Sequence, residues 1–79
     1  MKYIIFIKPE CPYCIKTIDL LKSKKKKYKA IKFKAGQEET LREVKEAYGW
    51  QTVPIVFLWR KDSLILIGGY TELSEHINK

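Results

Sequence analysis

The sequence lacks any long apolar run. Its longest runs, residues 4–7, 55–59 and 64–67, have the length of a β-strand, whereas a membrane helix needs about 18 apolar residues. The run near the start is also too short for the apolar segment of a secretory signal, and no small-residue cleavage site follows it. We therefore expect a cytoplasmic protein that does not enter a membrane.

The chain is too short for two domains. Its 79 residues are 46% hydrophobic, which is enough for one small core. A chain of this size buries only about 60 to 65% of its unfolded surface, so its stability is too small to support a strained, elaborate active site. We expect a single domain over residues 1–79 that acts as a monomer.

Cysteine and histidine are scarce. The chain has only Cys11, Cys14 and His76, whereas a structural zinc site needs four ligands. As a structural staple, a bridge that closes about four residues would stabilise by only about 2 kcal/mol before strain. Reversible redox chemistry is therefore the leading interpretation of the pair, and we expect no metal ligand. A metal cluster shared between two chains stays open as the alternative.

Acidic residues are scarce in the first half of the chain. Residues 1–34 hold eleven lysines against two acids, a net charge of +9, and residues 35–79 carry −2, which together give the net +7. The run Lys24–Lys27 is more typical of a solvated helix end than of a nucleic-acid site. A non-enzymatic module that binds nucleic acid or metal is the alternative from a different functional class.

The apolar pattern predicts alternating strands and helices. Residues 3–7 indicate a buried strand, and Pro12 suits the first position of a helix capped by Cys11. Residues 28–34 alternate as in a half-buried strand, with lysines facing outward, which also discourages edge-to-edge pairing. Residues 37–48 indicate a helix in which Glu38 pairs with Arg42, ended by Gly49.

The last third of the chain indicates a hairpin and a short helix. Residues 55–59 and 64–67 predict two strands joined by a turn. Gly68-Gly69 breaks the second strand, and Thr71 is the expected cap of a final helix with Leu73 and Ile77 facing inward. The predicted order is β-α-β-α-β-β-α, an α/β chain.

Cys11 is the candidate nucleophile. A free thiol titrates at about 8.5, but thiols at helix N-termini can fall to about 3.5 to 7.5, because backbone N–H groups and the helix dipole stabilise the thiolate. Lys8 adds a positive charge nearby. Cys14 follows one turn inside the helix, so it should keep a higher pKa. The hypothesis is that Cys11 attacks a disulfide and Cys14, or an outside thiol, releases the product.

Three motifs of the chain resemble those of one protein family. Cys11-Pro12-Tyr13-Cys14 follows the first strand, Thr52-Val53-Pro54 precedes another, and Gly68-Gly69-Tyr70 precedes the last helix. In this order and spacing, over essentially the whole chain, they resemble a dithiol glutaredoxin. The resemblance implies a thioredoxin-like fold, with a mixed four-stranded sheet flanked by helices. It also implies a disulfide oxidoreductase with no bound cofactor and with glutathione as co-substrate.

The resemblance further implies a binding site. The peptide bond before Pro54 would be cis, and the Val53 backbone would pair with the peptide part of glutathione. Lys8 would meet a carboxylate of glutathione, and Tyr13 would flank the sulfur. The γ-glutamyl end would lie at Gly69 and the residues after it. The implied binding residues are Lys8, Tyr13, Thr52, Val53, Pro54, Gly69, Tyr70 and Thr71.

Two positions depart from the glutaredoxin pattern. Many members carry a basic residue where this chain has Gln51, and an aspartate where it has Thr71. Each change removes a charge that would meet glutathione. Disulfide reduction is therefore better supported than glutathione binding. The expected partners are glutathione and disulfide-containing proteins. The alternative is a glutaredoxin-like redoxin, which thioredoxin reductase reduces and which serves ribonucleotide reductase.

Overall fold

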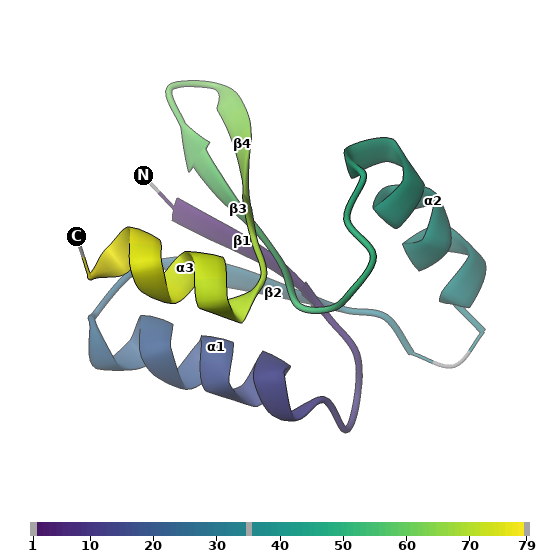
Figure 1. Ribbon diagram of the computed structural model, residues 1–79, viewed down its shortest axis with the longest axis horizontal. Coiled ribbons are helices and arrows are strands. Elements are labelled where there is room, and N and C mark those ends of the chain that lie inside the picture. The colour runs from purple at the N-terminus through teal and green to yellow at the C-terminus, as the bar shows by residue number, and fades with distance from the viewer. Residues whose placement is uncertain (1, 35, 79) are drawn as a thin grey trace.

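The computed structural model describes residues 2–34 and 36–78. Seven elements follow one another in the predicted order (Figure 1). Their bounds are β1 Lys2–Ile7, α1 Pro12–Ser23, β2 Tyr28–Lys32, α2 Glu38–Tyr48, β3 Ile55–Arg60, β4 Ser63–Gly68 and α3 Tyr70–Ile77. Among the described residues, no helix is long and apolar enough to cross a membrane.

The four strands form one mixed sheet in the order β2-β1-β3-β4. β1 is parallel to β2 and antiparallel to β3, and β4 is antiparallel to β3. Phe6 of β1, for example, lies between Ile31 of β2 and Ile55 of β3. The strand that begins right after the Thr52-Val53-Pro54 motif therefore lies directly beside the strand that leads to Cys11.

Helices cover both faces of the sheet. On one face, α1 and α3 lie side by side (Figure 1) and bury Leu21 and Leu73 against Ile5. On the other face, α2 packs Leu41 against Ile55 and Phe57. The alternation of side chains along a strand explains this division, because successive side chains point to opposite faces and both faces of β3 are apolar. The sheet thus separates two apolar clusters and holds α1 in place.

The predicted elements agree with the structure to within a few residues, and two local predictions are wrong. Gly69, not Thr71, is the N-cap of α3, because Gly69 adopts the extended backbone and its N–H donates to Glu72 Oε1 across 2.9 Å. Arg42 pairs with Glu39 at 3.7 Å and not with Glu38. The carboxylate of Glu38 instead accepts a hydrogen bond from the backbone N–H of Gly36.

Candidate active site

Cys11 begins the first helix. It is the N-cap of α1 with φ −110° and ψ 106°, and Pro12 takes the first helical position, where its missing N–H costs nothing. The first turn of α1 holds no acidic residue. The unpaired N–H groups and the positive end of the helix dipole therefore act on the sulfur of Cys11 without an opposing carboxylate in that turn.

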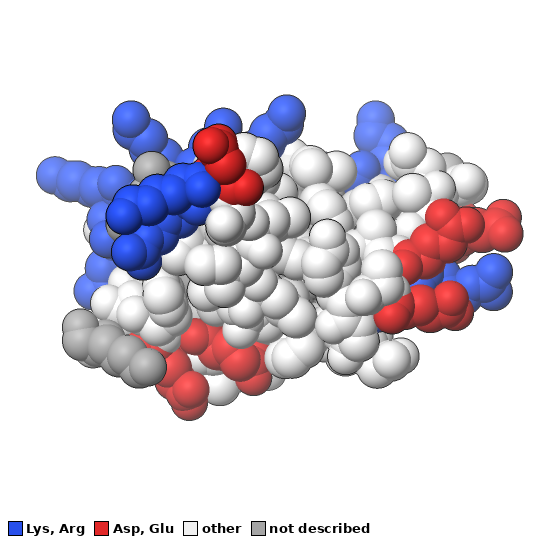
Figure 2. All heavy atoms as spheres, turned by 90° about the horizontal axis from the view of Figure 1, so that it is seen from above, with Lys and Arg blue, Asp and Glu red and all other residues white. Residues whose placement is uncertain are grey.

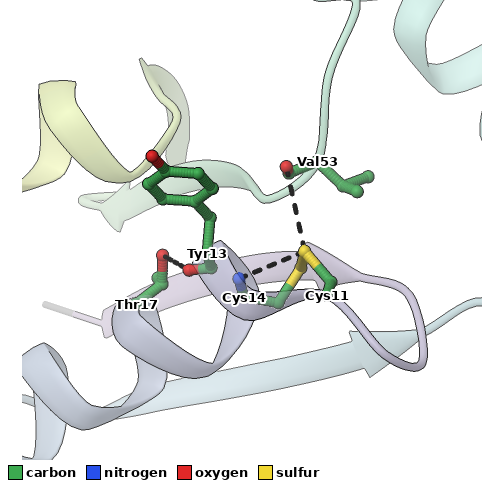
Figure 3. Close-up of a disulfide and its surroundings, with 5 residues drawn as sticks. All are labelled: Cys11, Tyr13, Cys14, Thr17 and Val53. Atoms are coloured by element: carbon green, nitrogen blue, oxygen red, sulfur yellow. Dashed lines mark hydrogen bonds between the residues drawn. A yellow bond between two sulfur atoms is a disulfide. The ribbon is translucent and has the colours of Figure 1, made fainter.

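Cys11 and Cys14 form a disulfide (Figure 3). The exposure of the two residues differs: Cys14 is only 2% exposed, whereas Cys11 is partly exposed. The backbone N–H of Cys14 donates to Cys11 Sγ across 3.2 Å. A target disulfide can thus reach Cys11 from solvent, while Cys14 can be reached mainly through Cys11.

The loop before β3 lies opposite the cysteines. The Val53–Pro54 peptide bond is cis, as the resemblance implied, and Pro54 is buried. The carbonyl oxygen of Val53 lies 4.0 Å from Cys11 Sγ (Figure 3). The residue that was expected to pair with a peptide backbone is therefore beside the accessible sulfur.

A pocket of about 380 Å³ lies beside these residues. It is formed where the N-terminal ends of α1 and α3 meet the loop that leads to β3. Its lining residues are Tyr13, Trp50, Thr52, Val53, Pro54, Tyr70, Thr71 and Glu72. Glu72 is the only charged residue in this lining, which limits what the pocket can bind through charge.

Two tyrosines form one side of the pocket. The ring centroids of Tyr13 on α1 and Tyr70 on α3 are 6.0 Å apart, and Lys16 Nζ lies 4.9 Å from the centroid of Tyr13. Tyr13 is 55% exposed, so its ring presents an apolar surface to solvent next to the cysteine pair. Such a surface suits contact with a protein or peptide substrate.

The glycines after β4 bring α3 close to the pocket. Gly68 has φ +128°, and a Cβ placed there would lie 2.8 Å from Cγ of Glu72. The space that Gly68 leaves lets Glu72 fold back onto the N–H of Gly69. The indole of Trp50 also packs against both glycines, and its Nε1 is buried without a hydrogen-bond partner among the described residues.

The structure thus brings six of the eight implied binding residues together around one pocket, namely Tyr13, Thr52, Val53, Pro54, Tyr70 and Thr71. The other two are outside its lining. Gly69 is buried at the start of α3, and Lys8 is half-buried in the segment before Cys11.

Sequence reasoning did not single out three further residues of this region. Trp50 and Glu72 line the pocket. Thr17 is fully buried on α1, where its hydroxyl donates to the Tyr13 carbonyl oxygen across 2.8 Å. The position of Thr17, one turn after Cys14, could have identified it, because a threonine inside a helix can satisfy its hydroxyl on the carbonyl four residues earlier. Nothing in the sequence pattern marked Trp50.

Among residues 2–34 and 36–78, no group of three or more histidine, cysteine or acidic side chains lies close enough to hold a metal ion. Within these residues, the cysteine pair therefore has no neighbouring histidine, cysteine or acidic side chain that would complete a metal site with it.

Comparison with known proteins decides the family. The family model described as Glutaredoxin matches residues 3–62. The chain is 36% identical over 77 aligned residues to glutaredoxin-1 of Bos taurus, an alignment that covers 91% of this chain and 69% of the bovine protein. The chain belongs to the glutaredoxin family. This glutaredoxin is accordingly a thiol–disulfide oxidoreductase.

Solved structures agree with this assignment. The crystal structure of a wheat glutaredoxin superposes with a TM-score of 0.80 at 27% identity, covering 96% of this chain and 71% of the wheat chain. A solution structure of glutaredoxin from Brucella melitensis gives 0.76 at 27% identity, with 99% and 79% covered. Glutaredoxin 1 from Francisella tularensis, crystallised with cacodylate, gives 0.74 at 24% identity, with 99% and 98% covered, and supports the fold. The thioredoxin-like fold of this glutaredoxin is thereby confirmed.

Proposed function

We propose that this chain reduces protein disulfides and mixed disulfides of glutathione through Cys11 and Cys14, with electrons from glutathione. The observation that carries the proposal is the unequal exposure of the two sulfurs, with the accessible one at the N-cap of α1. A thiolate is the attacking species, and the helix N-terminus is where a thiolate is stabilised.

The reaction would run in two exchanges. The Cys11 thiolate attacks one sulfur of the target disulfide; a new S–S bond forms, the old one breaks, and the released sulfur takes a proton. The thiolate of Cys14 then attacks Cys11 and frees the second target thiol, which leaves the Cys11–Cys14 disulfide seen in the structure. The target gains two electrons and two protons, and the cysteine pair loses them.

Glutathione would restore the dithiol. One glutathione thiolate opens the Cys11–Cys14 disulfide and stays bound to Cys11, and a second removes it as glutathione disulfide. The pocket beside Cys11 suits the bound glutathione, because Val53 offers backbone groups and Tyr13 and Tyr70 offer apolar surface. A glutaredoxin potential of about −200 to −230 mV lets a reducing glutathione pool regenerate the pair, which is why we place the protein in the cytoplasm.

A specific observation favours a second candidate. The pocket lining carries no positive charge, and its one charged residue, Glu72, has the same sign as the carboxylates of glutathione. Reduction by thioredoxin reductase would need no such charge. A redoxin of this kind, with ribonucleotide reductase as its target, is therefore the alternative proposal.

One experiment separates the two candidates. The purified protein is given NADPH and a small disulfide, with glutathione and glutathione reductase in one tube and thioredoxin reductase in the other. Turnover in the first tube, lost in a Cys11→Ser variant, is the expected result. Turnover only in the second tube would show that thioredoxin reductase, and not glutathione, supplies the electrons. Turnover in neither tube would contradict both proposals.

A further inference from the structure

A second hollow, the α1–α3 groove, lies between the two helices that cover one face of the sheet. It has a volume of about 350 Å³, and its lining residues are Lys16, Asp19, Leu20, Ser23 and Tyr70. The first four belong to α1 and the last to α3, and the two helices run side by side (Figure 1). Tyr70 also lines the pocket beside the cysteines. The two hollows therefore meet at one side chain, but only the pocket has a place in the proposed reaction.

One stripe of α1 connects the cysteines with this groove. Its residues are three or four positions apart, so they lie on one side of the helix. They are Tyr13, Lys16, Leu20 and Ser23. The stripe begins at the exposed ring of Tyr13, 6.0 Å from the ring of Tyr70, and ends at Ser23, the last residue of α1. The groove therefore leads from the tyrosines beside Cys11 to the C-terminal end of α1.

The far end of the α1–α3 groove is strongly basic. Ser23 in its lining is flanked in the chain by Lys22 and Lys24–Lys27, which we call the lysine cluster, and all of these lysines are exposed. Nearer the tyrosines, the lining has Lys16 and Asp19, whose charges offset one another. Positive charge therefore increases along the groove with distance from the cysteines.

Other parts of the surface mix the two signs of charge. Seen from above, with α1 on the far side, basic and acidic side chains occur together at both ends of the molecule (Figure 2). Among residues 2–34 and 36–78, by contrast, no lysine of the lysine cluster forms an ion pair with a carboxylate. Glu75 of α3 does not oppose it from the other wall, since it is five residues after Tyr70 and about 140° further around that helix. The lysine cluster is thus available to an acidic partner.

We propose that the α1–α3 groove holds an extended acidic segment of the protein whose disulfide Cys11 attacks. This inference rests on the proposed disulfide reduction and adds the class of target. The twelve residues of α1 span about 18 Å, and an extended chain advances about 3.3 Å per residue. About five or six residues of the target therefore bridge the distance from the mixed disulfide to the lysine cluster. The targets are proteins with carboxylates about five to eight residues from the attacked cysteine.

The lining favours a segment of the disulfide substrate over a nucleic acid. A nucleic acid carries negative charge along its whole length, and Asp19 would repel it in the middle of the groove. An extended peptide can instead place apolar side chains against half-buried Leu20 and the tyrosine rings, and carboxylates against the lysine cluster. Because attraction between opposite charges speeds association, the preference should appear in the rate constant of reduction.

Reduction of designed peptides in a single turnover tests the proposal. The reduced protein is mixed with a peptide that contains an internal disulfide, a spacer of about six glycine and serine residues, and a cluster of glutamates. The matched neutral peptide has glutamines in place of the glutamates. Acid quenching and chromatography give the second-order rate constants, and no electron donor is needed. At low ionic strength the acidic peptide should react about tenfold faster, and high salt should remove most of the difference.

Two double variants locate the effect on the surface. Lys24→Gln/Lys26→Gln should lower the ratio of the two rate constants from about tenfold to about threefold. Lys29→Gln/Lys32→Gln removes the same charge from exposed positions of β2 and should leave the ratio near its wild-type value. A spacer shortened to about two residues should also lower the wild-type ratio, because the glutamates would then lie beside Asp19. Circular dichroism verifies that both variants are folded.

Two results would overturn the proposal. One is equal rate constants for the acidic and the neutral peptide. If a single-stranded oligonucleotide then binds the wild type and not Lys24→Gln/Lys26→Gln, the lysine cluster is a nucleic-acid surface instead. The other is an equal loss of preference in both double variants, which would show that only the net charge matters. Reduction of neither peptide is a separate outcome, because it would refute the proposed disulfide reduction and this inference with it.

Discussion

The backbone N–H of Cys14 donates to the sulfur of Cys11 across 3.2 Å. This contact exists because Cys11 caps the helix in which Cys14 is three residues further on, so the donor and the sulfur belong to the same turn. After reduction, the same N–H can donate to a thiolate at Cys11, and hydrogen bonds to charged groups are the stronger kind. The spacing of the two cysteines therefore serves both the disulfide and the nucleophile.

We expect the Cys11 thiol of the reduced protein to have a pKa below its ordinary value, because the N–H groups at the start of α1 stabilise the thiolate. Ultraviolet absorbance of the thiolate against pH in a Cys14→Ser variant measures it. The Cys14 thiol, measured in Cys11→Ser, should titrate higher, because it is buried inside the helix. A lower pKa for Cys14 would reverse the assigned roles.

The charge of Glu72 should weaken the binding of glutathione. Its carboxylate lies in the pocket lining and accepts the hydrogen bond from Gly69 N–H. Glu72→Gln keeps an acceptor for that N–H and removes the repulsion, so KM for glutathione should fall about twofold to fivefold. The free energy of unfolding should fall by about 0.5 kcal/mol, since a negative charge near the start of α3 is lost. An unchanged KM with a less stable protein would mean that Glu72 acts only as a helix cap.

Gly68 and Gly49 make a matched pair for backbone substitution. Both have positive φ, +128° and +66°, but a Cβ on Gly68 would meet Glu72 at 2.8 Å, whereas one on Gly49 would meet nothing within 4 Å. Gly49→Ala should cost about 1 kcal/mol, from the left-handed backbone alone. Gly68→Ala should cost about 3 kcal/mol or more. It should also raise KM for the reductant, because the shift would reach α3, which begins two residues later and lines the pocket. Urea unfolding compares the two, and equal costs would show that Glu72 adjusts freely.

Because of Tyr3, the free energy of unfolding should depend on pH in the alkaline range. Burial raises the pKa of Tyr3 above its ordinary value of about 10, because the core disfavours the phenolate. The folded state thus holds this proton at a pH where the unfolded chain loses it. The stabilisation is complete below the unfolded pKa and is lost as pH rises from about 10 toward the raised folded value.

Comparison with Tyr3→Phe isolates this effect, because the lysines titrate in both proteins. The difference in the free energy of unfolding between the wild type and Tyr3→Phe should be constant below pH of about 9. Above pH of about 10 the wild type should lose stability relative to Tyr3→Phe. A difference that is independent of pH would show that the Tyr3 phenolate reaches water in the folded protein.

Much of the fold was predictable because the local signals agree. β-branched runs predicted the strands of the sheet, and Pro12 after Cys11 predicted the start of α1. The cap of α3 was not predictable in the same way. Thr71 has the side chain that caps prefer, but the chain reverses at Gly68, where only glycine fits, and this starts the helix at Tyr70. A constraint from packing thus overrode the local preference.

By itself, the sequence determined the order of elements, the cysteine pair and the position of Cys11 at the start of a helix, since each depends on residues within one turn of one another. Only the tertiary structure decided which distant segments meet. The approach of Val53 to Cys11, the lining of the pocket by Trp50 and Glu72, and the position of β4 at one edge of the sheet all depend on how strands from separate parts of the chain pair. Their positions are determined by the close packing of two apolar faces on one sheet, a long-range condition that no local pattern contains.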